Sequence, residues 1–406
     1  MNKRVLVLAG GVPQIKLINE LHERDCFVIV ADYNENPVAK KYADIFYQKS
    51  TLDLNAIKEI AMREKVDMIL TCCTDQAVHT MAVISKELNL PCYLREETGV
   101  LVTNKLYMKR KFRENDIPTA DFWIAGKETD LTVDSFPLIV KPVDCNSSKG
   151  VVKVRNKNEL NIAVNKAIDL SRTKTAIVEE FIEGKELSVD AIVVNGKAKI
   201  LCVSTSDKIK DDNKFVIYRG YYPANISGIL YKRLEEIVQK IATSFKLENS
   251  PMLVQVLNKE DRLYVIEFSA RTGGCIKYHM IQLASGVDVI NVLVDISETK
   301  DVNINIRKSD KVIVNEFLYC TNGEFKCLYG FNECVQEGIL ERVFLLKNEG
   351  AVLNGVESSG DRIAAITYVA KDYGDYVKKH NQVAERVKIL DSRGIDIMRH
   401  DLLGKI

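Results

Sequence analysis

Apolar runs and amphipathic helices alternate through the first hundred residues of the chain. Short apolar runs that begin at Val5, Val28 and Met68 predict strands, and the segments between them place apolar residues on one helical face. Buried apolar strands separated by amphipathic helices are typical of a parallel sheet that helices cover. We therefore expect residues 1–100 to form an α/β domain with a parallel sheet.

The middle of the chain alternates less regularly. A basic amphipathic helix is predicted from Asn104 to Asn115. The pattern then predicts strands at 137–142, 151–154 and 176–180, a helix near 157–171, a strand-like stretch at 185–223, a helix at about 225–246 and a helix that ends near 298. Residues 301–406 mix strands with one clear helix, which has Asp372 as its expected N-cap and apolar positions up to Leu390.

The most informative pattern is a predicted β-hairpin at 253–271. Two alternating apolar runs flank a polar turn at 258–262. Side chains alternate between the faces of a strand, so Glu267, Ser269 and Arg271 point the same way, and Gln255 can lie opposite them. Oxygen atoms beside a guanidinium suit Mg²⁺ that holds phosphate, because Mg²⁺ prefers hard oxygen ligands and shares them with substrate. The competing interpretation is a solvated hairpin face.

Composition and charge exclude several classes of protein. The 406 residues carry 57 basic and 56 acidic side chains, a net charge of +1, which disfavours nucleic acid or an anionic membrane as a partner. No apolar run approaches the roughly 20 residues that span a bilayer, and the N-terminus shows no cleavage site. The ten cysteines are scattered without a CxxC pair, which predicts neither a zinc site nor a disulfide framework. We expect a cytoplasmic protein with reduced thiols.

The N-terminal segment raises one alternative function. Gly10 and Gly11 follow the first strand, and Asp32 ends the second, an arrangement that approximates a dinucleotide fingerprint. However, residues 9–14 do not read GxGxxG, and Pro13 would lie in the first turn of the helix. An NAD-binding oxidoreductase therefore stays an alternative with weak support.

Four further features precede the hairpin in the sequence. Lys141 ends an apolar strand, where a charge needs a partner, and a loop of small polar residues follows at 144–150. Such a loop can close over phosphates. The connector 179–186 joins two apolar strands and can bind a purine and a ribose through its backbone and carboxylates. Lys105 and Lys109 lie four apart on one helical face. Taken singly, these features also fit a solvated helix face, an ordinary turn and a charged loop.

Taken in this order along the chain, with the hairpin last, these motifs resemble those of the ATP-grasp enzymes. The resemblance is in particular to the carbamoyl-phosphate-synthase-like and biotin-carboxylase-like carboxylate–amine ligases. The resemblance covers almost the whole chain. It implies a Rossmann-like pre-ATP-grasp domain at 1–100, an ATP-grasp domain at 101–300 with a mobile lid at about 119–183, and a small α+β domain at 301–406. The segment 360–363 and the helix after it resemble the closing region of the family.

The resemblance also implies roles for individual residues. For ATP binding it implies Lys105 and Lys141 at the phosphates, Ser147, Ser148 and Gly150 in the lid, Glu179, Phe181 and Ile182 at the adenine, and Glu186 at the ribose. For the metal it implies Gln255, Glu267 and Ser269, and for catalysis Lys141 and Arg271. Ser269 departs from the family, which usually has Asn at this position.

The resemblance implies that the protein is an amide-forming ligase that uses ATP and Mg²⁺, or Mn²⁺. Its reaction would pass through an acylphosphate intermediate. The substrates would be a small carboxylate, such as an amino acid, and an amine, and the protein would be a homodimer. Candidate substrate contacts are Lys208, Arg219, Gly273 and Gly274, with Lys277, Tyr278 and His279 close behind. Arg219 could equally form a structural ion pair. Because of Ser269, an ATP-binding subunit without turnover stays a second alternative.

Overall fold

The N-terminal part of the chain is a four-stranded parallel sheet, as the alternating pattern predicts. Its strands are, in sheet order, β3 (Ile45–Gln48), β2 (Phe27–Asp32), β1 (Arg4–Leu8) and β4 (Met68–Leu70). The helices α1 (Val12–His22), α2 (Leu54–Arg63) and α3 (Asp75–Glu87) connect or follow them. Strand β3 was not predicted, because its apolar run Ile45–Tyr47 is only three residues long and none of its residues is fully buried. The structure is a computed structural model that describes residues 2–127, 131, 133, 135–145, 149–209 and 215–404.

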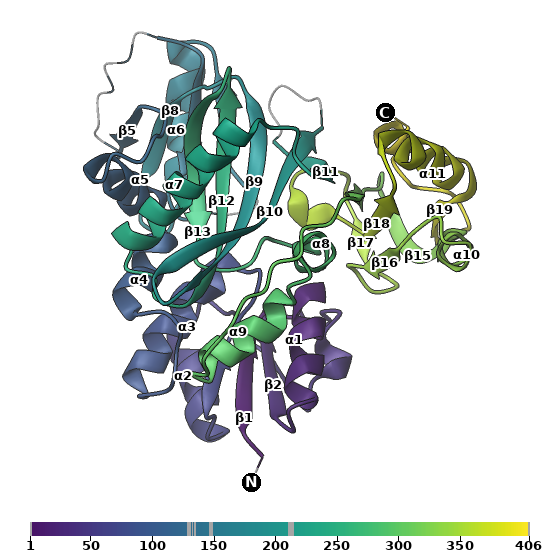
Figure 1. Cartoon of the computed structure of the whole chain (residues 1–406), viewed down its shortest axis with the longest axis horizontal. Coiled ribbons are helices and arrows are strands. Elements are labelled where there is room, and N and C mark those ends of the chain that lie inside the picture. Colours follow the sequence, from purple (N-terminus) through teal and green to yellow (C-terminus); the bar gives the residue numbers. More distant parts are fainter. Residues whose placement is uncertain are drawn as a thin grey trace.

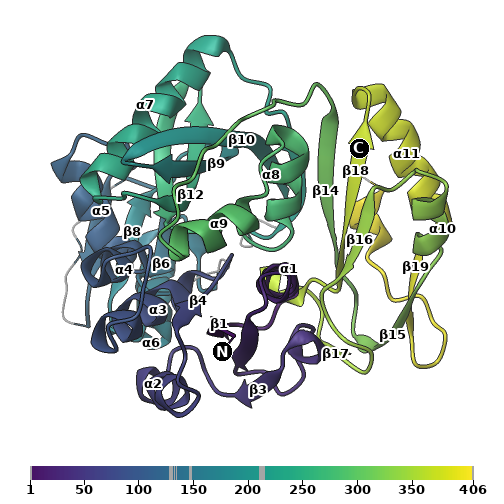
Figure 2. The same ribbon diagram turned by 60° about the horizontal axis from the view of Figure 1, so that its bottom comes forward.

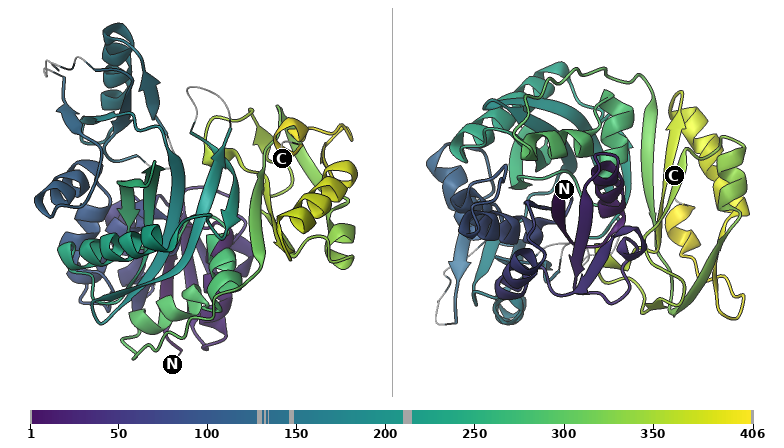
Figure 3. Two further views of the ribbon diagram at one scale, coloured as in Figure 1. Left: turned by 45° about the horizontal axis from the view of Figure 1, so that its top comes forward. Right: turned by 90° about the horizontal axis from the view of Figure 1, so that it is seen from below.

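A second, antiparallel sheet lies in the segment expected to form the lid. The helices α4 (Glu96–Val102) and α5 (Lys105–Glu114) lead into it, and the Asn104 side chain caps α5 by accepting from the amides of Leu106 and Tyr107. The sheet consists, in order, of β5 (Phe122–Ala125), β8 (Ala176–Glu180), β6 (Leu138–Pro142) and β7 (Val152–Val154), with α6 (Lys157–Leu170) packed on it. In the left view of Figure 3 this sheet projects from one end of the molecule.

The centre of the molecule is an eight-stranded antiparallel sheet. Its strands are, in order, β13 (Arg262–Ser269), β12 (Ser250–Lys259), β9 (Lys185–Val194), β10 (Lys197–Lys208), β11 (Ile217–Tyr222), β14 (Val312–Leu318), β18 (Ala364–Ala370) and β16 (Arg342–Leu345). Strands from both sides of residue 300 thus share one sheet, through the pairing of β11 with β14. The domain boundaries near 100 and 300 stay predictions.

The C-terminal part completes this sheet and adds a small one. The small sheet has the order β17 (Val352–Leu353), β15 (Gly323–Tyr329) and β19 (Lys388–Asp391), and the helices are α10 (Phe331–Gln336), α11 (Tyr373–Arg386) and α12 (His400–Leu403). Asp372 caps α11 as predicted, by accepting from the amide of Asp375. The prediction that this helix reaches Leu390 is wrong. It ends at Arg386, and Leu390 lies in β19, because an alternating strand can supply the same apolar residues.

The two faces of the central sheet have opposite character. On β9, Leu187, Val189 and Ala191 join the apolar core together with residues of α7 (Gly228–Ser244). The alternate residues Glu186, Ser188 and Asp190 therefore point to the other face, because successive side chains of a strand alternate. That polar face carries the candidate site.

Two further helices connect the central sheet to the N-terminal part. They are α8 (Lys277–Ser285) and α9 (Val289–Ser297), and α9 lies beside α1 in both Figure 1 and Figure 2. Arg24 donates to Asp295 at 2.7 Å across this contact, which closes a shared apolar core. Among the described residues no single helix is long and apolar enough to span a bilayer, and the pair that together meets the length and composition test, α8 with α9, bends by 101°.

Candidate active site

The predicted hairpin forms and brings its polar residues together. Strands β12 and β13 pair so that Gln255 lies opposite Glu267 and Leu253 lies opposite Ser269. One small cavity is lined by Gln255, Glu267, Ser269 and Arg271. The side chain of Glu267 is 34% exposed, so its carboxylate is accessible from this cavity. The predicted juxtaposition of these residues is therefore confirmed, while their roles stay predictions.

Arg271 is bound by a carboxylate that the sequence analysis missed. Its Nε donates to Asp75 Oδ1 at 2.8 Å, and its Nη2 binds Asp75 Oδ2. Burial would raise the pKa of Asp75, but the charge and hydrogen bonds of Arg271 outweigh it and hold this pKa below its ordinary value. Asp75 is the first residue of α3, just after β4. Its position at the carboxyl end of a parallel strand was the available signal, since ligands of such sheets bind there.

The expected phosphate-binding lysines are also paired with carboxylates. Lys105 donates to the carbonyl oxygen of Cys145 at 2.7 Å, and its Nζ lies 3.3 Å from Glu267 Oε2. Lys141 Nζ lies 3.1 Å from Glu179 Oε2. Together with the Arg271 pair, these contacts neutralise the cations that the resemblance assigns to ATP.

Lys109 is not on a solvated face, and that alternative interpretation of the basic helix is wrong. The residue is only 1% exposed. Its Nζ donates to Thr119 Oγ1 at 2.5 Å and to the carbonyl oxygen of Val265 at 3.2 Å, and lies 3.3 Å from Glu179 Oε2. The helical spacing of Lys105 and Lys109 places both on the side of α5 that meets β13, where Lys105 lies beside Glu267 and Lys109 donates to the carbonyl oxygen of Val265.

The expected adenine and ribose residues lie around the turn between β8 and β9. Glu186 binds Lys208 at 2.5 Å and accepts from Gln255 Nε2 at 3.1 Å, so it joins the turn to the hairpin. Ile182 is buried, and the ring of Phe181 lies 3.8 Å from Lys153 Nζ. Lys208, predicted to contact substrate, thus lies beside the expected ribose carboxylate.

The expected lid is described only in part. Ser147 and Ser148 lie outside the described residues. Gly150 has a φ of +75°, and a Cβ there would lie 2.8 Å from Leu170 Cδ1 and 2.9 Å from Pro142 Cγ. Glycine is therefore required both by the backbone conformation and by the close packing on the strand that carries Lys141.

A larger cavity of about 440 Å³ adjoins the hairpin. All three parts of the chain line it, including Asp75 from the first, Arg271, Gly273 and Gly274 from the second, and Arg362 from the third. Gly273 is tightly enclosed, since a Cβ there would lie 2.4 Å from Lys277 Cγ and 2.5 Å from Asp190 Oδ1. Its amide donates to Asp190 Oδ1 at 3.1 Å, and Lys277 Nζ lies 3.4 Å from Asp190 Oδ2.

Arg362 gives this cavity a cation that sequence reasoning did not select. Its Nε donates to the Tyr319 hydroxyl at 3.0 Å, its Nη2 donates to the carbonyl oxygen of Ile217 at 3.1 Å, and its guanidinium stacks 3.7 Å from the centre of the Phe317 ring. Within the described part of the chain, no carboxylate forms an ion pair with it at 4.0 Å or less. A buried or half-buried guanidinium held by neutral groups is suited to an anionic ligand.

Comparison with known proteins agrees with this geometry. A family profile described as the ATP-grasp domain matches residues 134–278. Over these residues the chain is similar to the ATP-grasp proteins. The L-arginine-specific L-amino acid ligase of Bacillus subtilis is 25% identical over 284 residues, which cover 67% of this chain and 68% of that protein.

A second relative and a solved structure point the same way. The formate-dependent phosphoribosylglycinamide formyltransferase of Prochlorococcus marinus is 27% identical over 252 residues, covering 59% of this chain and 62% of that protein. The crystal structure of an L-amino acid ligase from Bacillus licheniformis superposes with a TM-score of 0.81 at 19% identity, covering 96% of this chain and 99% of that one. This last likeness concerns the fold.

Two other predicted contacts do not line either of the two cavities at the hairpin. Arg219 is 1% exposed, and its Nε donates to Glu316 Oε1 at 2.7 Å, so it forms the structural ion pair that the sequence left open as an alternative. Using Arg219 as a substrate clamp would require breaking this buried pair, and we withdraw that assignment. His279 packs its ring on Phe344 at 5.4 Å, and burial lowers its pKa to about 4.

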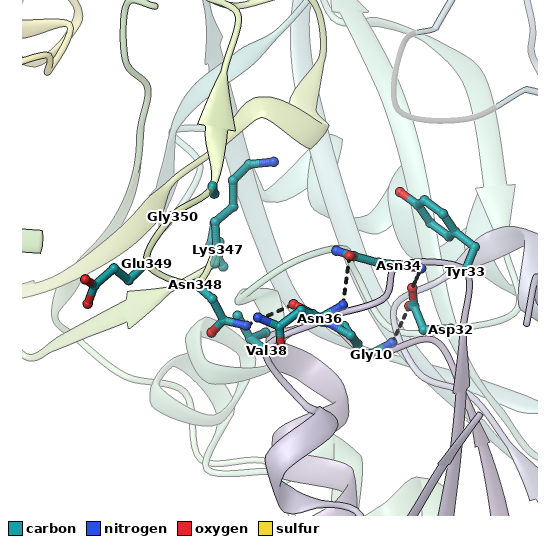
Figure 4. Close-up of a pocket in the computed structure, with 14 residues that line it drawn as sticks. Gly10, Asp32, Tyr33, Asn34, Asn36, Val38, Lys347, Asn348, Glu349 and Gly350 are labelled. Carbon is teal, nitrogen blue, oxygen red and sulfur yellow. Dashed lines mark hydrogen bonds between the residues drawn. The ribbon is translucent and has the colours of Figure 1, made fainter. Parts of the chain in front are cut away.

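The glycine segment of the N-terminal part does not support the dinucleotide alternative. Asp32 accepts from the amides of Gly10 and Asn34, both at 2.7 Å, so its carboxylate holds its own loop (Figure 4). The ring of Pro37 lies against Gly10, only 2.7 Å from the place of a Cβ. The adjoining pocket of about 350 Å³ lies between this loop and residues 346–351 of the C-terminal part. Both carboxylate oxygens of Asp32 thus already accept a backbone hydrogen bond, in place of the ribose hydroxyls of a dinucleotide.

The oxygen donors of the hairpin fit a hard divalent cation. Gln255, Glu267 and Ser269 line one cavity together with the carboxylate of Asp75. Amide, hydroxyl and carboxylate oxygens are the ligands that Mg²⁺ takes when phosphate supplies the rest. Within the described residues there is no group of three or more His, Cys, Asp or Glu side chains that could hold a metal alone. The donor set therefore suits a metal that arrives with a nucleotide.

Proposed function

We propose that the chain is an ATP-dependent carboxylate–amine ligase that forms an amide and converts ATP to ADP and phosphate. The observation that carries this proposal is that two cavities share polar residues of the hairpin. Glu267 and Arg271 of the hairpin face both the small cavity and the 440 Å³ cavity, so a nucleotide and a second substrate can meet there. The similarity to ATP-grasp ligases supports the same reaction class.

In the first proposed step, a carboxylate oxygen of the substrate attacks the γ-phosphorus of ATP. A bond forms between this oxygen and phosphorus, the bond to the β-γ bridging oxygen breaks, and ADP leaves. Lys105, Lys141 and Arg271 would offset the charge of the transferring group, since phosphoryl transfer depends on position and charge neutralisation. Mg²⁺ bound by Glu267 and Gln255 would supply further charge stabilisation at the phosphate oxygens.

In the second proposed step, an amine attacks the acylphosphate carbon. A carbon–nitrogen bond forms, the carbon–oxygen bond to phosphate breaks, and the amine loses a proton. Arg271 can steady the carbonyl oxygen and the departing phosphate from its place between the two cavities. Closure of the expected lid over the site would exclude water and protect the acylphosphate from hydrolysis.

For a nucleotide to bind here, the cations of this site must replace their carboxylate partners by phosphate oxygens. Glu267 holds Lys105, Glu179 holds Lys141, and Asp75 holds Arg271. Each cation is thereby kept in place near the phosphate site, and each can move from a carboxylate to a phosphate oxygen at little net change in charge pairing. We propose that these carboxylates preorganise the cations before ATP binds.

We propose an amino acid or a similar small carboxylate as substrate. Arg362 is the candidate anchor, because it faces the larger cavity and has no carboxylate partner among the described residues. Gly273 and Gly274 would let the substrate approach the backbone at the floor of this cavity, beside Lys277. The relative from Bacillus subtilis, named as a ligase of L-amino acids, agrees with this substrate class.

The direct test is an assay with ATP, Mg²⁺ and pools of amino acids as both carboxylate and amine. The proposal expects ADP and phosphate to appear in equal amounts with a new amide for at least one pair. Binding of ATP without ADP release for every pair would instead favour a nucleotide-binding subunit. Replacing Mg²⁺ by Mn²⁺ is expected to support turnover.

We also propose that the protein is a homodimer. This assembly state follows from the family resemblance alone. Light scattering on the purified chain measures it directly, and a mass equal to one 45.8 kDa chain would contradict it.

A further inference from the structure

Three charged side chains are buried together behind the expected phosphate site. Lys109 of α5 is 1% exposed, Glu179 of β8 is 4% exposed and Lys141 of β6 is 7% exposed. Both ammonium groups face the same carboxylate oxygen, Glu179 Oε2, at 3.3 Å and 3.1 Å. Glu179 Oε1 is buried and has no hydrogen-bond partner among the described residues. One carboxylate oxygen therefore lies beside two lysine ammonium groups in a largely buried position.

The two lysines differ in how firmly they are held. Lys109 also donates to the Thr119 hydroxyl, in the loop before β5, and to the carbonyl oxygen of Val265 in β13, so two neutral groups fix its position. Lys141 has Glu179 as its one polar partner among the described residues. Lys141 can thus leave the cluster, whereas Lys109 is fixed in it.

If Lys141 moved toward a nucleotide, the buried carboxylate of Glu179 would lose one of its two positive neighbours. A buried carboxylate without a counter-charge is strongly unfavourable, so the cluster would resist the movement. Lys109 removes this obstacle, because its ammonium stays beside the same oxygen. The cluster has two ammonium groups and one carboxylate, so Lys141 can bind phosphate while Lys109 still neutralises Glu179.

We propose that Lys109 is a positioning residue for nucleotide binding, which keeps Glu179 compensated while Lys141 turns to the phosphates of ATP. This inference rests on the proposed function, in that Lys141 contacts phosphate there. It gives Glu179 a role for its side chain, in addition to the expected role of the turn that follows it. It also gives Lys109 a role through Lys141 rather than through direct contact with ATP.

The cluster predicts a specific dependence on pH. Burial lowers the pKa of Lys109 to about 8, with the charge of Glu179 opposing this and that of Lys141 adding to it. The charged groups that face Lys109 are Glu179 from β8, Lys141 from β6 and Glu267 from β13. When Lys141 leaves, the pKa of Lys109 rises, so binding of the nucleotide takes up a proton above this pH. Affinity for ATP should therefore fall as the pH rises through about 8.

The test measures the dissociation constant of a non-hydrolysable ATP analogue with Mg²⁺ by calorimetry. The variants are K109M, K109R, E179Q, the double variant K109M/E179Q and K141M, each at pH values about one unit below and above the Lys109 pKa. We expect K109M to weaken binding by about tenfold or more at the lower pH, and K109R to bind within about threefold of wild type. The double variant should bind about as well as E179Q alone, since it leaves no unpaired carboxylate.

The pH dependence distinguishes this role from a merely structural one. Wild type should bind more weakly at the higher pH, and K109R should not, because arginine stays charged. If K109M does not fold, K109M/E179Q provides the test instead. It has no titrating lysine at position 109, so its affinity for the analogue should no longer fall at the higher pH. Equal affinity of K109M and wild type, or the same pH dependence in K109R, would overturn the inference.

The variant K141M distinguishes a failure of this inference from a failure of the proposed function. If K141M binds the analogue as wild type does, Lys141 is not at the phosphates and the proposed site is wrong. If K141M weakens binding while K109M does not, the site stands and the role of Lys109 alone is refuted.

Discussion

The carboxylate of Asp75 binds the guanidinium of Arg271 through two parallel contacts. Nε donates to Oδ1 at 2.8 Å, and Nη2 binds Oδ2. Asp75 belongs to α3 of the N-terminal part and Arg271 follows strand β13, so the pair joins two parts of the chain at the candidate active site. This fork geometry is the strong form of an arginine–carboxylate contact.

Replacing Asp75 by Asn should destabilise the fold near neutral pH. Loss of one partner of a partly buried pair is expected to lower the free energy of unfolding by about 2–3 kcal/mol. The folded-state pKa of Asp75 is depressed, so its contribution is present above the ordinary pKa of 3.8 and is lost as the pH falls below that value. The stability difference between wild type and D75N in denaturant titrations should therefore shrink in acid.

The matched control for D75N is D310N. Asp310 is 86% exposed and lies 3.5 Å from Lys311, so the same change of charge occurs there without burial. Equal stability losses in D75N and D310N would mean that the Asp75 pair contributes no more than an exposed one.

Replacing Glu267 by Gln should remove turnover while nucleotide binding largely persists. The carboxylate is the one acidic member of the expected metal ligands, and we expect a fall in turnover of about 100-fold or more. Release of ADP measures turnover, and calorimetry with an ATP analogue measures binding. The control E260Q changes an exposed Glu in the turn of the same hairpin. Unchanged turnover in E267Q would place Glu267 outside the site.

Two adjacent glycines offer a matched pair of variants. A Cβ at position 273 would meet Lys277 and Asp190, whereas one at 274 would meet nothing within 4 Å. We expect G273A to displace these charged side chains and lower the melting temperature, and G274A to leave the melting temperature nearly unchanged. Thermal unfolding checks both, and equal melting temperatures of the two variants would contradict the packing at Gly273.

Replacing Arg362 by Met tests the proposed carboxylate anchor. Loss of a charge-assisted hydrogen bond to substrate should raise KM for the carboxylate by about tenfold or more, with KM for ATP nearly unchanged. R393M is the control, because the Arg393 side chain is 71% exposed and pairs only locally with Asp391. An equal rise in KM for ATP would argue that Arg362 serves the nucleotide or the fold instead.

Periodicity predicted most of the fold because the elements are long and their buried faces regular. The hairpin is the clearest example, since alternation alone placed Gln255 opposite Glu267. The end of α11 was misplaced because Val387 and Leu390 continue a helical spacing that a turn into β19 equally satisfies. The four-residue strand β3 was not predicted because it is short and its side chains show no alternation of buried and exposed positions.

The site was predictable only where its residues share one strand or one turn. Asp75 and Arg362 reach the cavities from segments distant in sequence, and no local spacing relates them to the hairpin. The burial of Lys109 was hidden for the same reason, since its partners Glu179 and Val265 come from other strands. Arg219 shows the reverse error, because a polar strand residue suited to substrate faces Glu316 across a strand pair.

Transfer of oxygen from the carboxylate to phosphate tests the central claim most directly. The carboxylate substrate is labelled with ¹⁸O, and the phosphate released with ATP, Mg²⁺ and an amine is analysed by mass spectrometry. An acylphosphate requires that one carboxylate oxygen leave with the phosphate, so the account predicts phosphate carrying one ¹⁸O for each amide formed. Amide formation with unlabelled phosphate, or with AMP and pyrophosphate as products, would contradict it.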